Sequence, residues 1–328
     1  MAAEFGNTYN LAGLAEDVEN IIYDISPMDT VMFNTAKKKK ATAVRHDWQV
    51  DELASPVNTN YHLEGADATY GSVPPTTVLS NYCQISRKTL MASKTADVVR
   101  KYGRAEEFAY QLAKRGKELK RDIETRMLQN GQSSAGTSTT AARAAAGFEA
   151  QCYENYVLPT TSNTGTTSAF TAGLFLAPTD GTATGAGSTL TEAYLKSALQ
   201  AAWEEGGDPS LILAPAFQKA IMAGFSGATA FSGNQVTVSK NAQGVVMGAV
   251  DLYRSDFGLH TIKLSRYMRT RNVFCIDPDY ISLAWLRPIK YEELAKTGDA
   301  TKGMLIGEWT FCLDNPKAHA KVVDLLNA

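Results

Sequence analysis

An apolar repeat of helical period runs through residues 97–130. Its members lie three or four positions apart, close to the ~3.6 of an α-helix, and share one face: Val98, Tyr102, Ala105, Ala109, Leu112, Gly116, Leu119, Ile123 and Met127. The polar positions between them hold nine Lys or Arg and six Asp or Glu, including Glu124, so their charge is nine minus six, or +3. Asp97 suits the start of a helix and Asn130-Gly131 suits its stop. The pattern predicts one long amphipathic helix over residues 97–130.

Upstream, the pattern changes from a helical to a strand period. Residues 44–50 alternate strictly, and one face holds Val44, His46, Trp48 and Val50. This alternation predicts a half-buried strand, and a second strand is predicted over residues 77–90. About two dozen residues separate the two strands, too many for a tight turn, so they form an extended projection. From residue 46 to residue 86 there is no Lys or Arg, and five acids give a charge of about −5: Asp47, Asp51, Glu52, Glu64 and Asp67.

The flanking segments complete the order of elements. Residues 17–36 are rich in apolar side chains, are broken at Ser26-Pro27 and lead into a basic run at 37–40, which indicates an arm. Between residues 160 and 189, 23 of 30 positions are Gly, Ala, Ser or Thr, which predicts a loop or edge strand. The capping box Thr189-x-x-Glu192 predicts the start of one helix. Pro215 is predicted to lie in the first turn of another helix. Strands are predicted near residues 211–213, 244–253, 259–265, 272–276, 280–287 and 309–311. Without a regular β-α-β-α repeat, this order predicts an α+β fold.

Composition and charge narrow the function classes. The 328 residues carry 32 Lys and Arg against 34 Asp and Glu, a net charge of −2, which disfavours a basic nucleic-acid coat. No apolar run approaches the ~18 residues of a membrane span, and the first ten residues lack a signal pattern. We therefore expect a soluble chain that is not exported and has no membrane partner. Its four scattered Cys are expected to be reduced, buried thiols.

The sequence offers no catalytic constellation. Its four His stand apart from one another and from any H-E-x-x-H pattern. The spacing from Gly131 to Gly136 is that of a phosphate loop without its Lys, and Gly185-Ala186-Gly187 lacks the third Gly of a dinucleotide loop. We predict no catalytic, cofactor-binding or metal-binding residues. An enzyme with an unrecognised site stays the remote alternative.

The acidic projection and the basic helix are parts that a single copy of the chain cannot fully bury. Their opposite charges favour a contact protein in which one copy's projection lies over the next copy's helix. Repeated head-to-tail contacts of that kind form closed rings when the rotation closes.

Several stretches, taken together, resemble the major capsid proteins of tailed double-stranded DNA bacteriophages. They are residues 24–30 (DISPMDT), 46–53 around Trp48-Gln49, 109–121 (AYQLAKRGKELKR), 277–280 (DPDY), 286–288 (LRP) and 293–298 (ELAKTG). The resemblance covers nearly the whole chain. It implies the shell fold that these proteins share with the herpesvirus capsid floor and with encapsulin compartments.

The resemblance also implies a division of the chain into regions. In order, these are an N-terminal arm (1–42), an extended loop (43–91), a spine helix with the Gly/Thr-rich connection of the peripheral domain (92–189), an axial domain (190–254), and the peripheral-domain strands with the C-terminus (255–328).

For function, the resemblance implies a structural subunit that self-assembles into hexamers and pentamers of an icosahedral head around double-stranded DNA. The expected inter-subunit contacts are Trp48, Asp51, Glu52, Glu64 and Asp67 in the loop, and Arg100, Arg104, Lys114 and Arg121 on the helix. Lys37, Lys38, Lys39 and Lys40 form either a solvated linker or a lumen-facing group in weak, non-specific contact with DNA. The protein would assemble in the host cytoplasm and reside in the virion. Separate scaffolding and portal proteins are expected partners, with decoration proteins as a further one.

Two features of related shell proteins bear on what is expected of this chain. Some family members join a loop Lys covalently to a partner Asn, but this loop has no Lys between Lys40 and Lys88, so no such chemistry is predicted. An encapsulin-like cellular compartment is the alternative to a phage head.

Overall fold

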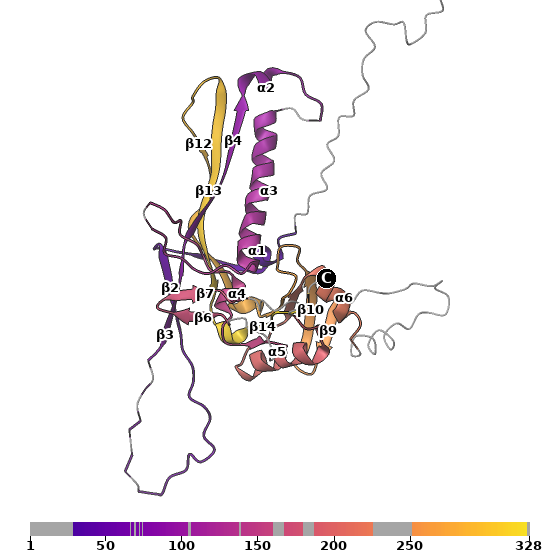
Figure 1. The fold of residues 1–328 in the computed structure, drawn as a ribbon. Helices are drawn as coiled ribbons and strands as arrows, with labels where there is room; N and C mark the ends of the chain where they lie inside the picture. The colour runs from indigo at the N-terminus through magenta and orange to yellow at the C-terminus, as the bar shows by residue number, and fades with distance from the viewer. Residues whose placement is uncertain are drawn as a thin grey trace, which may run out of the picture.

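A computed structural model describes residues 29–65, 67–68, 70–71, 73, 75–103, 106–137, 139–159, 167–179, 187–225 and 251–326. A tall layer of long strands and one helix stands on a rounded body of short strands and helices, and a long loop projects from the body on the side away from the tall layer (Figure 1). Helices and strands are mixed without a β-α-β-α repeat, so the predicted α+β class is confirmed.

The tall layer is a four-stranded sheet in the order β1-β12-β13-β4. Its strands are β1 (Lys37–Lys40), β12 (Ile281–Glu293), β13 (Ala300–Leu313) and β4 (Gln84–Ser93). β12 and β13 form an antiparallel hairpin, with irregular register between Trp285 and Lys290, and β1 pairs with the start of β12 in parallel. The basic run of the arm is therefore an edge strand rather than a linker.

The rounded body contains a six-stranded sheet in the order β5-β14-β11-β8-β10-β9. Its strands are β5 (Tyr156–Val157), β14 (Ala320–Val322), β11 (Val273–Ile276), β8 (Leu211–Ala214), β10 (Gly258–Leu264) and β9 (Leu252–Ser255). The region boundary expected at residue 254 falls inside β9, which pairs with β10 as its neighbour. The sheet therefore does not divide at that position.

Two helices accompany this sheet, α5 (Glu192–Glu204) and α6 (Ala216–Met222). The apolar face of α5 buries Leu195 and Leu199 in the core of the body. Its N-cap is Thr191, whose side chain accepts a hydrogen bond from the backbone N–H of Tyr194, and not Thr189. Pro215 lies at the N-cap of α6, one position before the predicted first turn.

The helix predicted over residues 97–130 is shorter than its pattern suggested. The structure has α3 (Glu107–Leu128) and a separate short helix, α2 (Lys94–Val98). Gly103 between them adopts φ 73°, a left-handed backbone that interrupts an α-helix. Only the C-terminal half of the predicted apolar face is buried. Leu119, Ile123 and Met127 are buried, whereas Val98 is 85% exposed.

The strand prediction at the loop is half right. β2 (Arg45–Val50) alternates between exposed and half-buried positions, as its pattern predicts, and pairs with β3 (Thr77–Tyr82). The predicted strand over residues 77–90 is in fact two strands, β3 and β4, which belong to different sheets. The chain changes sheets at Cys83, whose N–H donates to the carbonyl of Val44.

The described part of the Gly/Thr-rich stretch contains a small hairpin, β6 (Ala169–Thr171) and β7 (Leu174–Leu176), which agrees with edge-strand material. Its turn, Ala172-Gly173, has two positive φ values of 53° and 77°. The remaining short elements are α1 (Val31–Thr35), α4 (Phe148–Gln151), and the 3-10 turns η1 (Pro278–Tyr280) and η2 (Pro316–Ala318). The predicted strand at 244–253 and the arm before residue 29 lie mostly outside the described residues.

Candidate assembly surfaces

The root of the projecting loop is fixed to the body by two buried amide side chains. Asn81 on β3 donates to the carbonyl of Phe311 (2.7 Å) and accepts from the N–H of Ala146 (2.9 Å). Gln151 on α4 donates to the same Phe311 carbonyl and to the carbonyl of Ala146, and it accepts from the N–H of Leu313, each at 2.9 Å. Both side chains are fully buried, so β3, α4 and β13 are held together by bonds that water cannot replace.

Trp48, predicted to contact a neighbour, packs inside its own chain. Its ring stacks on Phe175 of β7 at 6.1 Å between centroids, and it adjoins a small buried cluster around Leu79. The half-buried face of β2 therefore faces the body of the same subunit. Its role toward a neighbour stays a prediction.

Beyond this root, residues 51–76 form the part that we call the loop. Its hydrogen bonds among the described residues beyond Glu52 join positions no more than two apart, such as Tyr61 N–H to the Thr59 carbonyl. Its large apolar side chains are strongly exposed: Leu53 (99%), Tyr61 (78%), Leu63 (85%), Tyr70 (99%) and Val73 (90%). Exposed apolar side chains concentrated on one segment make the loop a candidate assembly surface.

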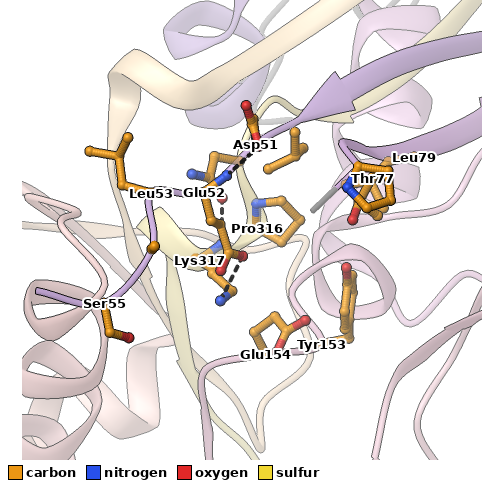
Figure 2. A pocket seen from close by; sticks show the side chains of 14 residues that line it. Asp51, Glu52, Leu53, Ser55, Thr77, Leu79, Tyr153, Glu154, Pro316 and Lys317 are labelled. Carbon is orange, nitrogen blue, oxygen red and sulfur yellow. Dashed lines mark hydrogen bonds and ion pairs between the residues drawn. The ribbon is translucent and has the colours of Figure 1, made fainter. Parts of the chain in front are cut away.

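A cavity of about 430 Å³ opens where the loop leaves the body (Figure 2). Across it, the Lys317 ammonium binds the Glu52 carboxylate at 2.7 Å, and it lies 3.4 Å from Glu205 at the end of α5. The hydrogen bond that the Lys317 ammonium donates to Glu52 is the main cause that raises the pKa of Lys317. Burial raises the pKa of Tyr153 in the cavity wall to about 12, so its phenol stays neutral. The charge of Glu52 is thus engaged within the subunit.

The other acids of the predicted projection differ in how far they are engaged. Asp51 Oδ1 accepts a hydrogen bond from the backbone N–H of Glu52 at 2.9 Å. Asp47 on β2 pairs with Arg45 at 2.8 Å. Glu64 and Asp67 are exposed, and no partner for either is found within the described residues. These two carboxylates are therefore available to another molecule.

Helices α2 and α3 lie on the side of the body away from the loop in the same chain (Figure 1). Lys114 is exposed on α3 and Arg100 is exposed after α2, while Arg104 lies outside the described residues. The Arg121 guanidinium lies over the Tyr267 ring at 5.9 Å. One chain therefore does not bring its acidic loop and its basic helix together.

A second apolar surface, which we call the tip patch, lies around α2. It consists of Met91 (67% exposed), Val98 (85%), Val99 (57%) and Tyr102 (58%). Figure 1 shows α2 at the end of the tall layer, on the side away from the loop. The pattern of the sequence missed this surface, because it assigned Val98 and Tyr102 to a buried helix face.

The four basic residues of β1 are partly neutralised. Lys37 and Lys39 pair with Asp279 and Asp314, each at 2.7 Å, and the bond with Asp279 raises the pKa of Lys37. Lys38 lies over the Phe33 ring at 5.9 Å. All four side chains remain exposed, and contact with DNA stays a prediction.

The cysteine side chains are buried, and burial disfavours their reactive thiolate form. All four Cys are free and buried, as predicted, and burial raises the pKa of Cys83 to about 11 and that of Cys152 to about 12. Within the described ranges, no three His, Cys, Asp or Glu side chains gather in a way that would hold a metal ion. In the same part of the chain, no helix has the length and apolar character to cross a membrane.

Solved phage capsids share this fold. The capsid subunit of cyanophage A-1(L) matches with a TM-score of 0.63 at 11% identity, over 96% of this chain and 98% of that one. The structure of the phage G major capsid and decoration proteins matches with a TM-score of 0.55 at 9% identity, over 98% of this chain and 100% of that one. The chain therefore has the shell fold of phage capsid proteins.

Sequence comparison identifies the family. A curated major capsid protein of Escherichia phage Phieco32 is 40% identical over 125 residues, which are 38% of this chain and 35% of that protein, so the match spans about a third of the relative's length. The family of SU10 major capsid proteins matches residues 2–326, and the chain belongs to this family. The resemblance drawn from the sequence is confirmed, and a major capsid protein is a component of the virion shell.

Proposed function

We propose that this chain builds the hexamers and pentamers of an icosahedral head around double-stranded DNA, with one subunit's loop lying over the helix end of the next. The observation that carries the proposal is the pair of exposed apolar surfaces at opposite ends of the subunit, the loop and the tip patch. A contact between unlike surfaces on successive copies is heterologous, and it closes into rings at a suitable rotation.

Charge supports the same pairing. The free carboxylates Glu64 and Asp67 are on the loop, and the exposed cations Arg100 and Lys114 are on the helix side. Complementary charges at the rim fix orientation and register more than affinity, whereas buried apolar area supplies most of the affinity. Trp48 and Glu52, which are engaged within the subunit, would act by holding the loop's root in place.

Reversal of the two free carboxylates tests this pairing. We expect E64K/D67K to raise the subunit concentration needed for assembly about tenfold or more, because like charges then face each other. Shells and capsomers would be counted by sedimentation and negative-stain electron microscopy, with circular dichroism to verify folding. Adding R100E/K114E to the reversed loop should restore assembly, and the neutral variant E64Q/D67N should show an intermediate effect. Normal shells from E64K/D67K would refute the electrostatic part of the proposal.

Further partners belong to the same proposal. Separate scaffolding and portal proteins would direct assembly, and decoration proteins would bind outside, as the phage G structure with its decoration proteins suggests for a shell of this fold. Contact with packaged DNA would be weak, because the net charge is −2 and Lys37 and Lys39 are already paired. The region names arm, loop, spine, peripheral and axial domain are proposed on the same basis. The role would be structural rather than enzymatic, and the phage family favours a head over a cellular compartment.

A further inference from the structure

The short helix α1, the first described element of the arm, starts without a cap of its own. The first N–H groups of a helix have no partner within that helix. Thr30 occupies the N-cap position, yet its side chain makes no capping hydrogen bond. Met32 and Phe33 are buried, so water does not serve their N–H groups.

A carboxylate from α3 supplies the missing acceptors. Glu124 Oε1 accepts from the N–H of Met32 at 2.9 Å, and Oε2 accepts from the N–H of Phe33 at 2.7 Å. The side chain is fully buried, although the sequence pattern placed it on the polar face of the helix. Burial raises the pKa of Glu124, and the backbone N–H groups of α1 oppose that rise.

Apolar contacts and the following strand hold α1 in the same place. Met32 and Phe33 join the main core with Leu119 and Ile123 of α3, and the Phe33 ring meets Trp285 edge-on at 6.4 Å. Immediately afterwards, β1 pairs with β12 and the N–H of Ala41 donates to the Trp285 carbonyl. The arm is thus held at two successive places, by Glu124 and by the sheet.

We propose that Glu124 is the positioning residue of the N-terminal arm. Its carboxylate fixes α1 on the helix α3 and so sets where the described start of the arm, residues 29–36, lies on the subunit. The inference rests on the proposed shell function, and it adds that shell assembly depends on the position of α1. A carboxylate suits this role because its two oxygens can accept from two backbone N–H groups at once.

The test compares E124Q with E118Q in the full chain. Glutamine keeps the shape of the side chain but presents an N–H₂ group to one of the two backbone donors. We expect hydrogen exchange in the peptide covering residues 31–36 to accelerate about ten- to a hundredfold, since a buried donor loses its acceptor. Peptides from β1 and β13 should exchange as in the wild type, and shell yield should fall together with the protection of α1. Glu118 is a matched control, because it is on the same helix in an i,i+3 pair with Arg115, and E118Q should change neither readout.

A rescue separates positioning from general stability. Thr30→Asp in the E124Q background gives α1 its own capping side chain, and it should restore both the exchange protection and the shell yield. Unchanged protection in E124Q would show that Glu124 does not anchor the arm. Lost protection with normal shells would show that the anchor does not position the arm for assembly. If the wild type and E118Q also form no shells, the proposed function fails, while the exchange result still decides whether Glu124 is the anchor.

Discussion

Glu149→Ala is expected to lower the free energy of unfolding by about 3–5 kcal/mol, because it removes the negative partner from a buried charge network. The Glu149 side chain is 1% exposed and binds Arg269 at 2.8 Å. The Lys321 ammonium, also buried, donates to the Glu149 carbonyl and to Ser168 Oγ, each at 2.6 Å. Burial lowers the pKa of Lys321, and the negative charge of Glu149 opposes that shift. Without this carboxylate, folding has to bury the Lys321 ammonium with less compensation.

Urea denaturation of the soluble subunit measures this effect. Glu154→Ala is the matched control, since Glu154 lies a few residues further along the chain and is exposed, and its loss should change stability by no more than about 0.5 kcal/mol. The network joins α4 to β14 and to the turn before β11, so the loss should affect the whole subunit in one transition. A change below about 1 kcal/mol in Glu149→Ala would contradict the view that these charges depend on one another.

Acidification is expected to lower the free energy of unfolding by about 3 kcal/mol at most, because His319 takes up a proton more readily in the unfolded chain. His319 is fully buried, and burial lowers its pKa from 6.5 to about 4. Its Nδ1 accepts from the N–H of Asp277 at 3.1 Å, and its Nε2 faces the Tyr280 carbonyl at 3.4 Å. This geometry suits a neutral ring with its proton on Nε2, and a second proton would confront the Asp277 N–H.

The direction of this pH effect follows from where the proton binds. Between pH 6.5 and pH 4 the unfolded chain binds a proton at His319 that the folded chain does not, so stability falls as the pH is lowered through this window. The unfolding free energy of the wild type and of H319Q should be compared at pH 7 and at pH 4.5. The difference between the two proteins should change with pH, whereas H62Q, at an exposed loop position, should follow the wild type. A difference that is constant with pH would mean that His319 does not titrate in this way.

Sequence periodicity predicted the elements that local contacts determine. Leu119, Ile123 and Met127 recur at helical spacing and are buried, and β2 alternates because one face packs on the body. The same reasoning failed between α2 and α3, where Val99 leaves the helix in an extended conformation and Gly103 adopts a left-handed one. A glycine inside an apolar repeat is compatible with a continuous helix, so its conformation depends on the packing around it.

The features that define the assembly surfaces depend on contacts between distant positions. Glu124 counts as a polar-face acid until α1, about ninety residues upstream, is brought against it. Asn81 and Gln151 resemble ordinary polar residues in a strand and a short helix, and their shared acceptor on Phe311 comes from near the C-terminus. Residues 77–90 have the composition of one strand, and only the pairing with two different partners divides them at Cys83.

The buried hydrogen bonds of Asn81 and Gln151 have a mechanical consequence for the loop beyond them. They make the loop's base stiff, whereas the loop itself is tied to the body through Glu52 and otherwise bonds only to its own near neighbours within the described residues. Because the loop is long and its base is stiff, a small rotation at the base becomes a large displacement at the far end of the loop. Any change in orientation at the base, where Lys317 bridges Glu52 and Glu205, is therefore enlarged at the far end of the loop, while the core keeps its packing.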